Sequence, residues 1–333
     1  MRVSQFLSKC SAEAMVDAAA NLLAGNLVAF PTETVYGLGA DACNAAAVAR
    51  IYAAKGRPAD HPLIVHVASM DALGDWADDV PGFAISLARD FWPGPMTLIV
   101  NRSELAGDFV TGGQNTVGVR VPDHPVALGL LEAFARAGGK GVAAPSANRF
   151  GNVSPTTAQA VAVELGDYLS DSDQILDGGA CDVGVESTII DCTGDAPRIL
   201  RPGAITAEMI EESTGLTVGV SASASGASIR EEEIRVSGSL ESHYAPTATV
   251  VLDQSPVAGQ GFIAMSDVAT PEGVVRLAAP TTHEEFARVL YSALRAADEK
   301  RLKSVVVTQP VGDGIAIAIR DRLMRAAHPG SNS

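Results

Sequence analysis

The sequence predicts an α/β protein built from two domains. The chain of 333 residues is too long for one small domain. Short apolar runs typical of buried strands alternate with amphipathic helical patterns along most of the chain. A stretch rich in Ser, Ala, Gly and Glu at 221–239 separates the final segment from the rest, which is typical of an interdomain linker.

The first domain opens with a helical pattern over 15–23 that ends at Gly25. The run 27–30 predicts a buried strand, and a polar loop with hydroxyls and glycines follows Pro31. Asn44 is the expected N-cap of a helix that ends in the basic turn 55–58. Further strands are expected over 63–67, 96–100, 116–121, 141–144, 174–177, 187–192 and 197–200, and helices over 69–91 (two short ones), 124–137, 154–165 and 206–213.

The final segment has the same alternation on a smaller scale. Strands are expected over 249–252, 261–265 and 304–308. A helix should begin at Thr282 with Glu285 completing a capping box, and the chain should close with a helix over 315–327. This pattern predicts a small open α/β domain.

Charge and composition narrow the class of ligand. A net charge of −15 argues against a broad nucleic-acid-binding face. No apolar run approaches the ~20 residues of a membrane span, and the first residues lack the apolar core of a signal peptide, so we expect a cytoplasmic protein. Cations next to the polar loops instead suggest a small anionic ligand: Lys55, Arg57, Arg120, Arg149, Arg198 and Arg201.

The four cysteines do not suggest a metal site. They are scattered, without C-x-x-C or histidine spacing, so we expect reduced structural thiols and no metal ligands. They are Cys10, Cys43, Cys181 and Cys192.

Lys55 and Arg57 are the first candidates for chemistry. Cations on a rigid turn suit phosphate oxygens, Lys as a point charge and Arg as a fork. The alternative is a solvated helix C-terminus, where cations are favoured in any case.

Hydroxyl-rich stretches form the next candidates. Ser146 and Asn148, which follow a strand, and Ser154 have the side chains to cradle an anion, although turn chemistry and N-capping use the same residue types. Residues 186–188, at the start of a predicted strand, and Arg201 could line the same pocket. The alternative is that they are ordinary surface residues of an edge strand. Thr32, Thr34, Tyr36 and His66 form a fourth set, in which a lone strand histidine is more often a core residue.

Several catalytic motifs are absent from the sequence. There is no G-x-x-x-x-G-K-[ST], no G-x-G-x-x-G after a strand, and no G-x-S-x-G or H-E-x-x-H. The residues therefore favour electrostatic handling of phosphates and hydrogen bonding of a small polar substrate over a covalent nucleophile.

Taken in order, several stretches resemble the YrdC-like family, specifically the threonylcarbamoyl-AMP synthases. They are PTETVYGLGADA, KGRP with PLIVHV, FWPGPMTLIV, TVGVRVPDH, APSAN with SPTT, and ESTIID with ILRPGAI, and together they span about 15–207. SHYAP at 242–246 and the closing GIAIAIRDRLMRAA resemble the long form of that family. The resemblance implies a twisted open sheet with a central ligand cavity over 1–210, a linker over 211–246 that reaches over the active site, and a small Rossmann-like α/β domain over 247–333.

The resemblance also implies a reaction. L-threonine, bicarbonate and ATP would give threonylcarbamoyl-adenylate and pyrophosphate, with Mg²⁺ accompanying the ATP and no prosthetic group. A partner tRNA threonylcarbamoyltransferase would then modify an adenosine of tRNA (t6A), without stable tRNA binding by this chain and without a membrane. Two alternatives stand beside this reading. A hydrogenase-maturation carbamoyltransferase is disfavoured because its additional segments are absent, and a non-catalytic RNA-binding or ribosome-maturation module is disfavoured by the acidic charge.

Residue roles follow from the family pattern. Lys55 and Arg57 would be catalytic. L-threonine would contact Thr34, His66, Arg120, Ala144 and Ser187. The nucleotide would contact Arg57, His61, Thr116, Ser146, Asn148, Ser154, Arg201 and Tyr244. His61 stands where the family often has Asn, and a histidine can still donate a hydrogen bond there.

Overall fold

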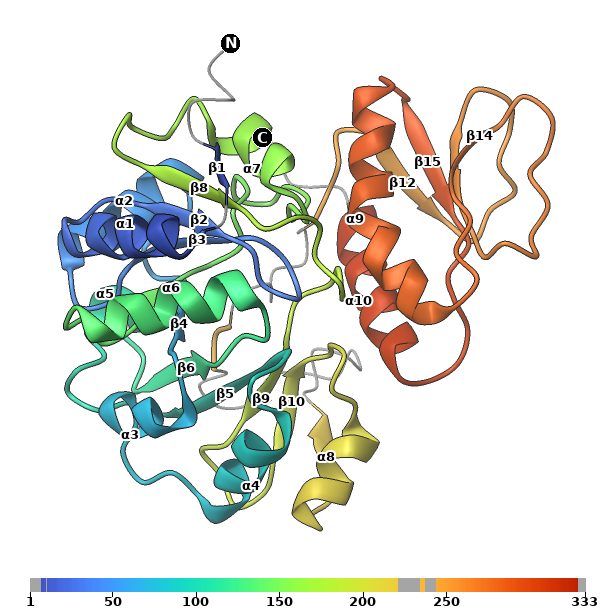
Figure 1. Cartoon of the computed structure of the whole chain (residues 1–333). Coiled ribbons are helices and arrows are strands. Elements are labelled where there is room, and N and C mark those ends of the chain that lie inside the picture. Colours follow the sequence, from blue (N-terminus) through green and yellow to red (C-terminus); the bar gives the residue numbers. More distant parts are fainter. Residues whose placement is uncertain (1–6, 10, 221–233, 237–243, 329–333) are drawn as a thin grey trace.

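Two sheets form the framework of the protein (Figure 1). The structure is a computed structural model that describes residues 7–9, 11–220, 234–236 and 244–328. A large mixed sheet occupies the first part of the chain, and a small parallel sheet occupies the second. The predicted α/β class with a second small domain is therefore confirmed.

Within the described residues the large sheet has 11 strands in the order β1-β8-β2-β3-β7-β4-β6-β5-β9-β10-β11. The strands expected from the sequence are present, and three others were not expected. One of these, β3, runs through the glycine-rich stretch that we expected to be a polar loop, because it pairs antiparallel with both β2 and β7. The strands are β1 (Leu7–Lys9), β2 (Val28–Phe30), β3 (Gly37–Asp41), β4 (Ile64–His66), β5 (Met96–Asn101), β6 (Thr116–Arg120), β7 (Val142–Ala143), β8 (Gln174–Asp177), β9 (Thr188–Asp191), β10 (Arg198–Arg201) and β11 (Gly219–Val220).

The helices of the first part cover this sheet (Figure 1). Helix α7 starts four residues later than we expected from the Ser-Pro-Thr-Thr stretch, with Thr157 as its N-cap. The preceding backbone is engaged elsewhere, because the Pro155 carbonyl accepts from the Tyr36 N–H and the Thr156 carbonyl from the Cys181 N–H. The helices are α1 (Ala12–Leu23), α2 (Ala45–Lys55), η2 (Met70–Ala72), α3 (Leu73–Trp76), α4 (Gly82–Phe91), α5 (Asp108–Thr111), α6 (Pro125–Arg136), α7 (Ala158–Leu165) and α8 (Ala207–Thr214).

The second part has a four-stranded parallel sheet in the order β12-β15-β13-β14. Strand β14 was not expected. The predicted capping box at Thr282 is shifted by one residue, since the Glu285 carboxylate accepts from the Thr281 N–H instead. The elements are β12 (Thr249–Leu252), β13 (Gly261–Ile263), β14 (Val275–Ala278), α9 (His283–Glu299), β15 (Ser304–Val307) and α10 (Ile315–Ala327).

Helices α9 and α10 lie on the side of the small sheet that faces the first part (Figure 1). One hydrophobic cluster joins the two, with Val35, Val153 and Val185 packed among residues of α9 such as Phe286 and Leu290. Burial of such a shared cluster stabilises the contact between the two parts. Of the predicted linker, 221–233 and 237–243 lie outside the described residues, so the predicted domain boundaries stay a prediction.

Two smaller expectations concern the chain as a whole. Cys43, Cys181 and Cys192 are free thiols, and Cys10 lies outside the described residues. In the described part of the chain, no helix combines the length and the apolar character that crossing a membrane requires.

Candidate active site

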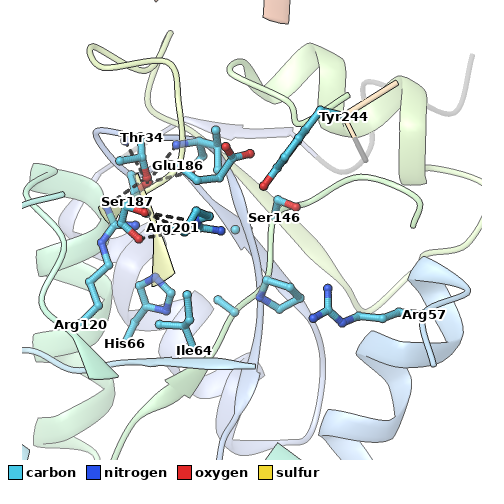
Figure 2. Close-up of a pocket in the computed structure, with 15 residues that line it drawn as sticks. Thr34, Arg57, Ile64, His66, Arg120, Ser146, Glu186, Ser187, Arg201 and Tyr244 are labelled. Carbon is cyan, nitrogen blue, oxygen red and sulfur yellow. Dashed lines mark hydrogen bonds between the residues drawn. The ribbon is translucent and has the colours of Figure 1, made fainter. Parts of the chain in front are cut away.

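An open cavity with an empty volume of about 520 Å³ lies at the centre of the large sheet (Figure 2). This volume includes space that is open to solvent, and a concave site with a few convergent polar groups is typical of small-molecule binding. Nine of the residues expected to bind substrates are on its wall: Thr34, Arg57, His66, Arg120, Ala144, Ser146, Ser187, Arg201 and Tyr244. All five residues expected to bind threonine are in this group.

Strand register brings His66 and Arg120 together. Strands β4 and β6 are parallel neighbours, and His66 is paired with Arg120 in their register. Side chains at paired positions of adjacent strands share a face, so both side chains reach the same cavity. Phe30 packs edge-on against the His66 ring, with 6.0 Å between ring centroids.

A buried ion pair orients Arg120. Its Nη2 donates to Glu33 Oε1 at 2.5 Å and to Thr34 Oγ1 at 3.0 Å. The other Glu33 oxygen accepts from the Asp123 N–H at 3.0 Å. Glu33 therefore holds the guanidinium in one orientation toward the cavity. The sequence reading missed Glu33, although a carboxylate flanked by Thr32 and Thr34 in a buried loop is a signal for such a pairing.

Two buried polar atoms on this side have no hydrogen-bond partner among the described residues: Arg120 Nε and His66 Nδ1. Burial and the nearby Arg120 lower the pKa of His66 to about 3, so its ring is neutral near pH 7. Buried polar groups are normally hydrogen-bonded. Both residues line the cavity, and a cationic guanidinium beside a neutral imidazole suits a polar ligand with an anionic group.

Arg57 and Tyr244 lie across the cavity from Arg120 and His66 (Figure 2). Arg57 donates to the Pro62 carbonyl at 3.0 Å. Burial lowers the pKa of Arg57 to about 10, which leaves it cationic near neutral pH.

Arg201 donates from Nε and Nη2 to the Ser187 carbonyl at 3.1 and 2.9 Å. Arg57 and Arg201 are thus buried cations that donate hydrogen bonds to backbone carbonyls, which are uncharged. Their positive charge suits a phosphate ligand.

Lys55 and Asn148 lie behind the cavity wall. Lys55 is buried, and its Nζ donates to the carbonyls of Ser146 and Asn148 at 2.5 Å each. The Asn148 side-chain amide donates to the carbonyls of Arg149 and Asn152. Neither side chain lines the cavity, and the expected place of both beside the phosphates stays a prediction. Lys55 instead fixes the loop that presents Ser146.

Three other predicted nucleotide contacts also lie outside the cavity wall. Ser154 Oγ donates to Glu186 Oε1 at 2.6 Å. Thr116 lines a neighbouring depression together with Ile64 and Val236.

His61 packs edge-on against Phe150, with ring centroids 5.3 Å apart. The centroid of the Phe150 ring lies 5.8 Å from the Arg57 guanidinium carbon. His61 is thus near Arg57 without lining the cavity.

Glu186 is a second buried carboxylate of this region and, unlike Glu33, it lines the cavity. The sequence placed it in a possible pocket segment but gave it no role. Burial alone would raise its pKa, but Arg322, Arg201 and the Ser154 hydroxyl together lower it to about 2. Its ionised carboxylate is therefore balanced by cations from both parts of the chain.

Fold and cavity together define an α/β protein with a central cavity whose lining of cations and hydroxyls suits small anionic ligands. The family profile Sua5_yciO_yrdC, described as "Telomere recombination", matches residues 20–203. A second profile, "Threonylcarbamoyl-AMP synthase, C-terminal domain", matches residues 205–328. The chain belongs to the Sua5/YciO/YrdC family.

Similar proteins cover nearly the whole chain. A Bacillus subtilis protein named threonylcarbamoyl-AMP synthase is 40% identical over 335 residues, covering 94% of this chain and 92% of its own. A Pyrococcus abyssi protein of the same name is 39% identical and covers 91% of each chain. A crystal structure of P. abyssi Sua5 complexed with L-threonine superposes with a TM-score of 0.85 at 37% identity, covering 96% of both chains.

Proposed function

We propose that this protein is an L-threonylcarbamoyladenylate synthase, which makes threonylcarbamoyl-AMP and pyrophosphate from L-threonine, bicarbonate and ATP. The observation that carries the proposal is the cavity itself. One side presents Arg120 Nε and His66 Nδ1 without protein partners, and the other presents Arg57 and Ser146. A small amino acid suits the first side and a nucleotide suits the second. The names and coverage of the relatives support the same activity.

The threonine half of the cavity, formed by Thr34, His66, Arg120, Ala144 and Ser187, would orient the amino-acid substrate. Arg120 Nε would bind the substrate carboxylate, while neutral His66 and Thr34 would accept hydrogen bonds from the amine. Ala144 would offer backbone and Ser187 a hydroxyl. The amine nitrogen adds to CO2 derived from bicarbonate and loses a proton, which gives a carbamate. A carbamate oxygen then forms a bond to the α-phosphorus, and the bond to pyrophosphate breaks.

The nucleotide half of the cavity, formed by Arg57, Ser146, Arg201 and Tyr244, would stabilise the negative charge of the phosphates. Arg57 and Arg201 would neutralise the negative charge that grows on the phosphate oxygens as pyrophosphate leaves. Ser146 and Tyr244 would contact the nucleotide from the same side. Four further residues expected to contact the nucleotide do not line the cavity, and they would come into contact with the nucleotide when it binds: His61, Thr116, Asn148 and Ser154. Lys55 would act through the Ser146 loop.

Mg²⁺ would enter as part of the ATP substrate. In the part of the chain that the structure describes, no group of three or more His, Cys, Asp or Glu side chains is placed to hold a metal ion. Mg²⁺ typically keeps several waters and takes phosphate oxygens as ligands. The ion would therefore be held mainly by the triphosphate and water.

The product would pass to a downstream tRNA threonylcarbamoyltransferase. The net charge of −15 disfavours stable tRNA binding by this chain. The linker would tether Tyr244 over the cavity, between a catalytic domain over 1–210 and the small domain over 247–333.

Incubation of the purified protein with ATP, bicarbonate and L-threonine tests this function. We expect pyrophosphate release that depends on threonine, with threonylcarbamoyl-AMP identified by mass. Absence of threonine-dependent release would show the proposal to be wrong. tRNA binding at moderate salt without turnover would favour the RNA-binding alternative.

A further inference from the structure

Glu186 lies where the active site meets the second part of the chain. Its Oε1 accepts from Ser154 Oγ at 2.6 Å. Its Oε2 accepts from the Tyr291 hydroxyl on α9 and from Arg322 Nε on α10, at 2.8 Å each. A carboxylate on the cavity wall is thus held by two helices that lie more than a hundred residues further along the chain.

Arg322 holds a second piece of the cavity wall. Its side chain is fully buried, and its Nη2 donates to the Pro202 carbonyl at 3.0 Å. Pro202 directly follows Arg201, and Glu186 directly precedes Ser187. One guanidinium therefore fixes the two segments that carry Ser187 and Arg201, which are themselves joined by hydrogen bonds.

The loop before Glu186 lies directly on α9. Gly184 has a φ of +81°, and a Cβ at this position would lie 2.4 Å from the Cα of Arg288. The Arg288 Nε donates to the Asp182 carbonyl at 2.8 Å. Such a close approach of two backbones leaves the loop little freedom to move independently of the helix.

Charge explains why the arrangement needs an arginine. Glu186 lines the cavity close to Arg201, on the region proposed for the nucleotide. An unpaired buried carboxylate would repel an anionic ligand and cost free energy by itself. Arg322, which also pairs with Asp321, neutralises Glu186 together with Arg201, so Glu186 can order Ser154 without repelling phosphates.

We propose that Arg322 is a positioning residue of the active site: through Glu186 and the Pro202 carbonyl it sets the nucleotide half of the cavity, so that this half is complete only with α10 docked. The proposal rests on the nucleotide lying beside Arg57, Ser146 and Arg201. It gives the small domain a direct part in the reaction through a named contact.

The test compares Arg322→Met with Arg320→Met in the full chain. Arg320 lies on the same helix and donates to the Pro310 carbonyl within the small domain, so it is a matched control. For Arg322→Met we expect the KM for ATP to rise about tenfold or more while the KM for threonine changes less than about threefold. Arg320→Met should match the wild type in both. Equal values for the two variants would overturn the proposal.

The double variant Glu186→Gln with Arg322→Met separates positioning by charge from loss of packing. It removes both charges, so we expect a lower KM for ATP than in Arg322→Met alone. A KM equal to the product of the two single effects would contradict the proposal. If Arg322→Met does not fold, Tyr291→Phe takes its place, because it removes one donor from Glu186 and keeps the ring. We then expect about a threefold rise in the dissociation constant for ATP, and an unchanged constant overturns the proposal.

Calorimetric ATP binding is measured for every variant alongside turnover. If the wild type binds ATP but releases no pyrophosphate, the proposed reaction fails while the role of Arg322 is still decided by the binding constants.

Discussion

The two sides of the cavity are built differently. The side with His66 and Arg120 rests on the register of two adjacent parallel strands and on one buried ion pair with Glu33. The side with Arg57, Ser146 and Tyr244 is assembled from loops and from the end of the predicted linker. Its supports include Lys55 behind one loop and Arg322 of the last helix.

This difference implies that the two sides of the cavity respond differently to a ligand. A site fixed by strand pairing is preorganised, because a register shift would move every side chain of the strand to the other face. A site made of loops can adjust when a ligand enters. We therefore expect substitutions on the strand side to affect folding and turnover together, and substitutions on the loop side to affect nucleotide binding more than folding.

Arg120→Leu should have the largest effect. It removes the guanidinium and leaves Glu33 buried without its cation, so the free energy of unfolding should fall by about 3–5 kcal/mol. Threonine-dependent pyrophosphate release should fall about a thousandfold. Denaturant unfolding and the release assay measure the two effects. Arg136→Leu, at an exposed helix ion pair with Glu132, is the control and should change stability by less than about 1 kcal/mol.

Arg57→Ala and Lys55→Ala sharpen the comparison on the loop side. The sequence alone suggests that both lower turnover and leave the fold intact. The structure separates them, because Lys55 satisfies two buried carbonyls and Arg57 faces the cavity. Arg57→Ala should lower kcat/KM for ATP about a hundredfold at near-normal stability. Lys55→Ala should also destabilise the protein, by about 1–3 kcal/mol. Near-normal release from both variants would remove them from the mechanism.

His66 predicts a pH dependence on the strand side. Its folded pKa of about 3 lies below the ordinary value of 6.5. Only the unfolded chain takes up this proton as the pH falls from 6.5 toward 3, so the stability that neutral His66 contributes is lost over that window. At pH 5 the loss is about 2 kcal/mol. Urea unfolding of His66→Gln should lack this part of the decline between pH 7 and pH 5, and an identical decline would refute the assignment.

Cleavage of the chain between Ser221 and Ser239 tests the tether of Tyr244. We expect about a tenfold loss of ATP-dependent turnover, since Tyr244 would no longer be covalently joined to the catalytic part. Full activity of residues 1–210 alone would exclude a role for the linker and for the small domain.

His61→Asn should have the smallest effect. His61 packs against Phe150 near Arg57 but does not line the cavity. Both residue types donate hydrogen bonds, so the KM for ATP should change by less than about threefold. A larger change would show that the nucleotide contact at this position depends on the histidine ring.

Local patterns predicted most elements because local interactions decide them. Asn44 caps α2 through its own side chain, and the apolar spacing of α10 fits a helix over Ile315–Ala327. Strand β3 escaped prediction because its glycines carry no propensity for a strand, and only pairing with β2 and β7 makes them one. The small strands β1 and β11 likewise depend on partners distant in the sequence.

The α/β class, the alternation of elements and the residue types available for binding anions all follow from the sequence alone. Which of these residues face the cavity depends on the tertiary fold. It placed Lys55 behind a loop and made Glu33 and Glu186 the partners of buried arginines. The reason is physical: helix and strand periodicity arises from neighbours in sequence, whereas ion pairing and burial depend on segments that meet only after folding.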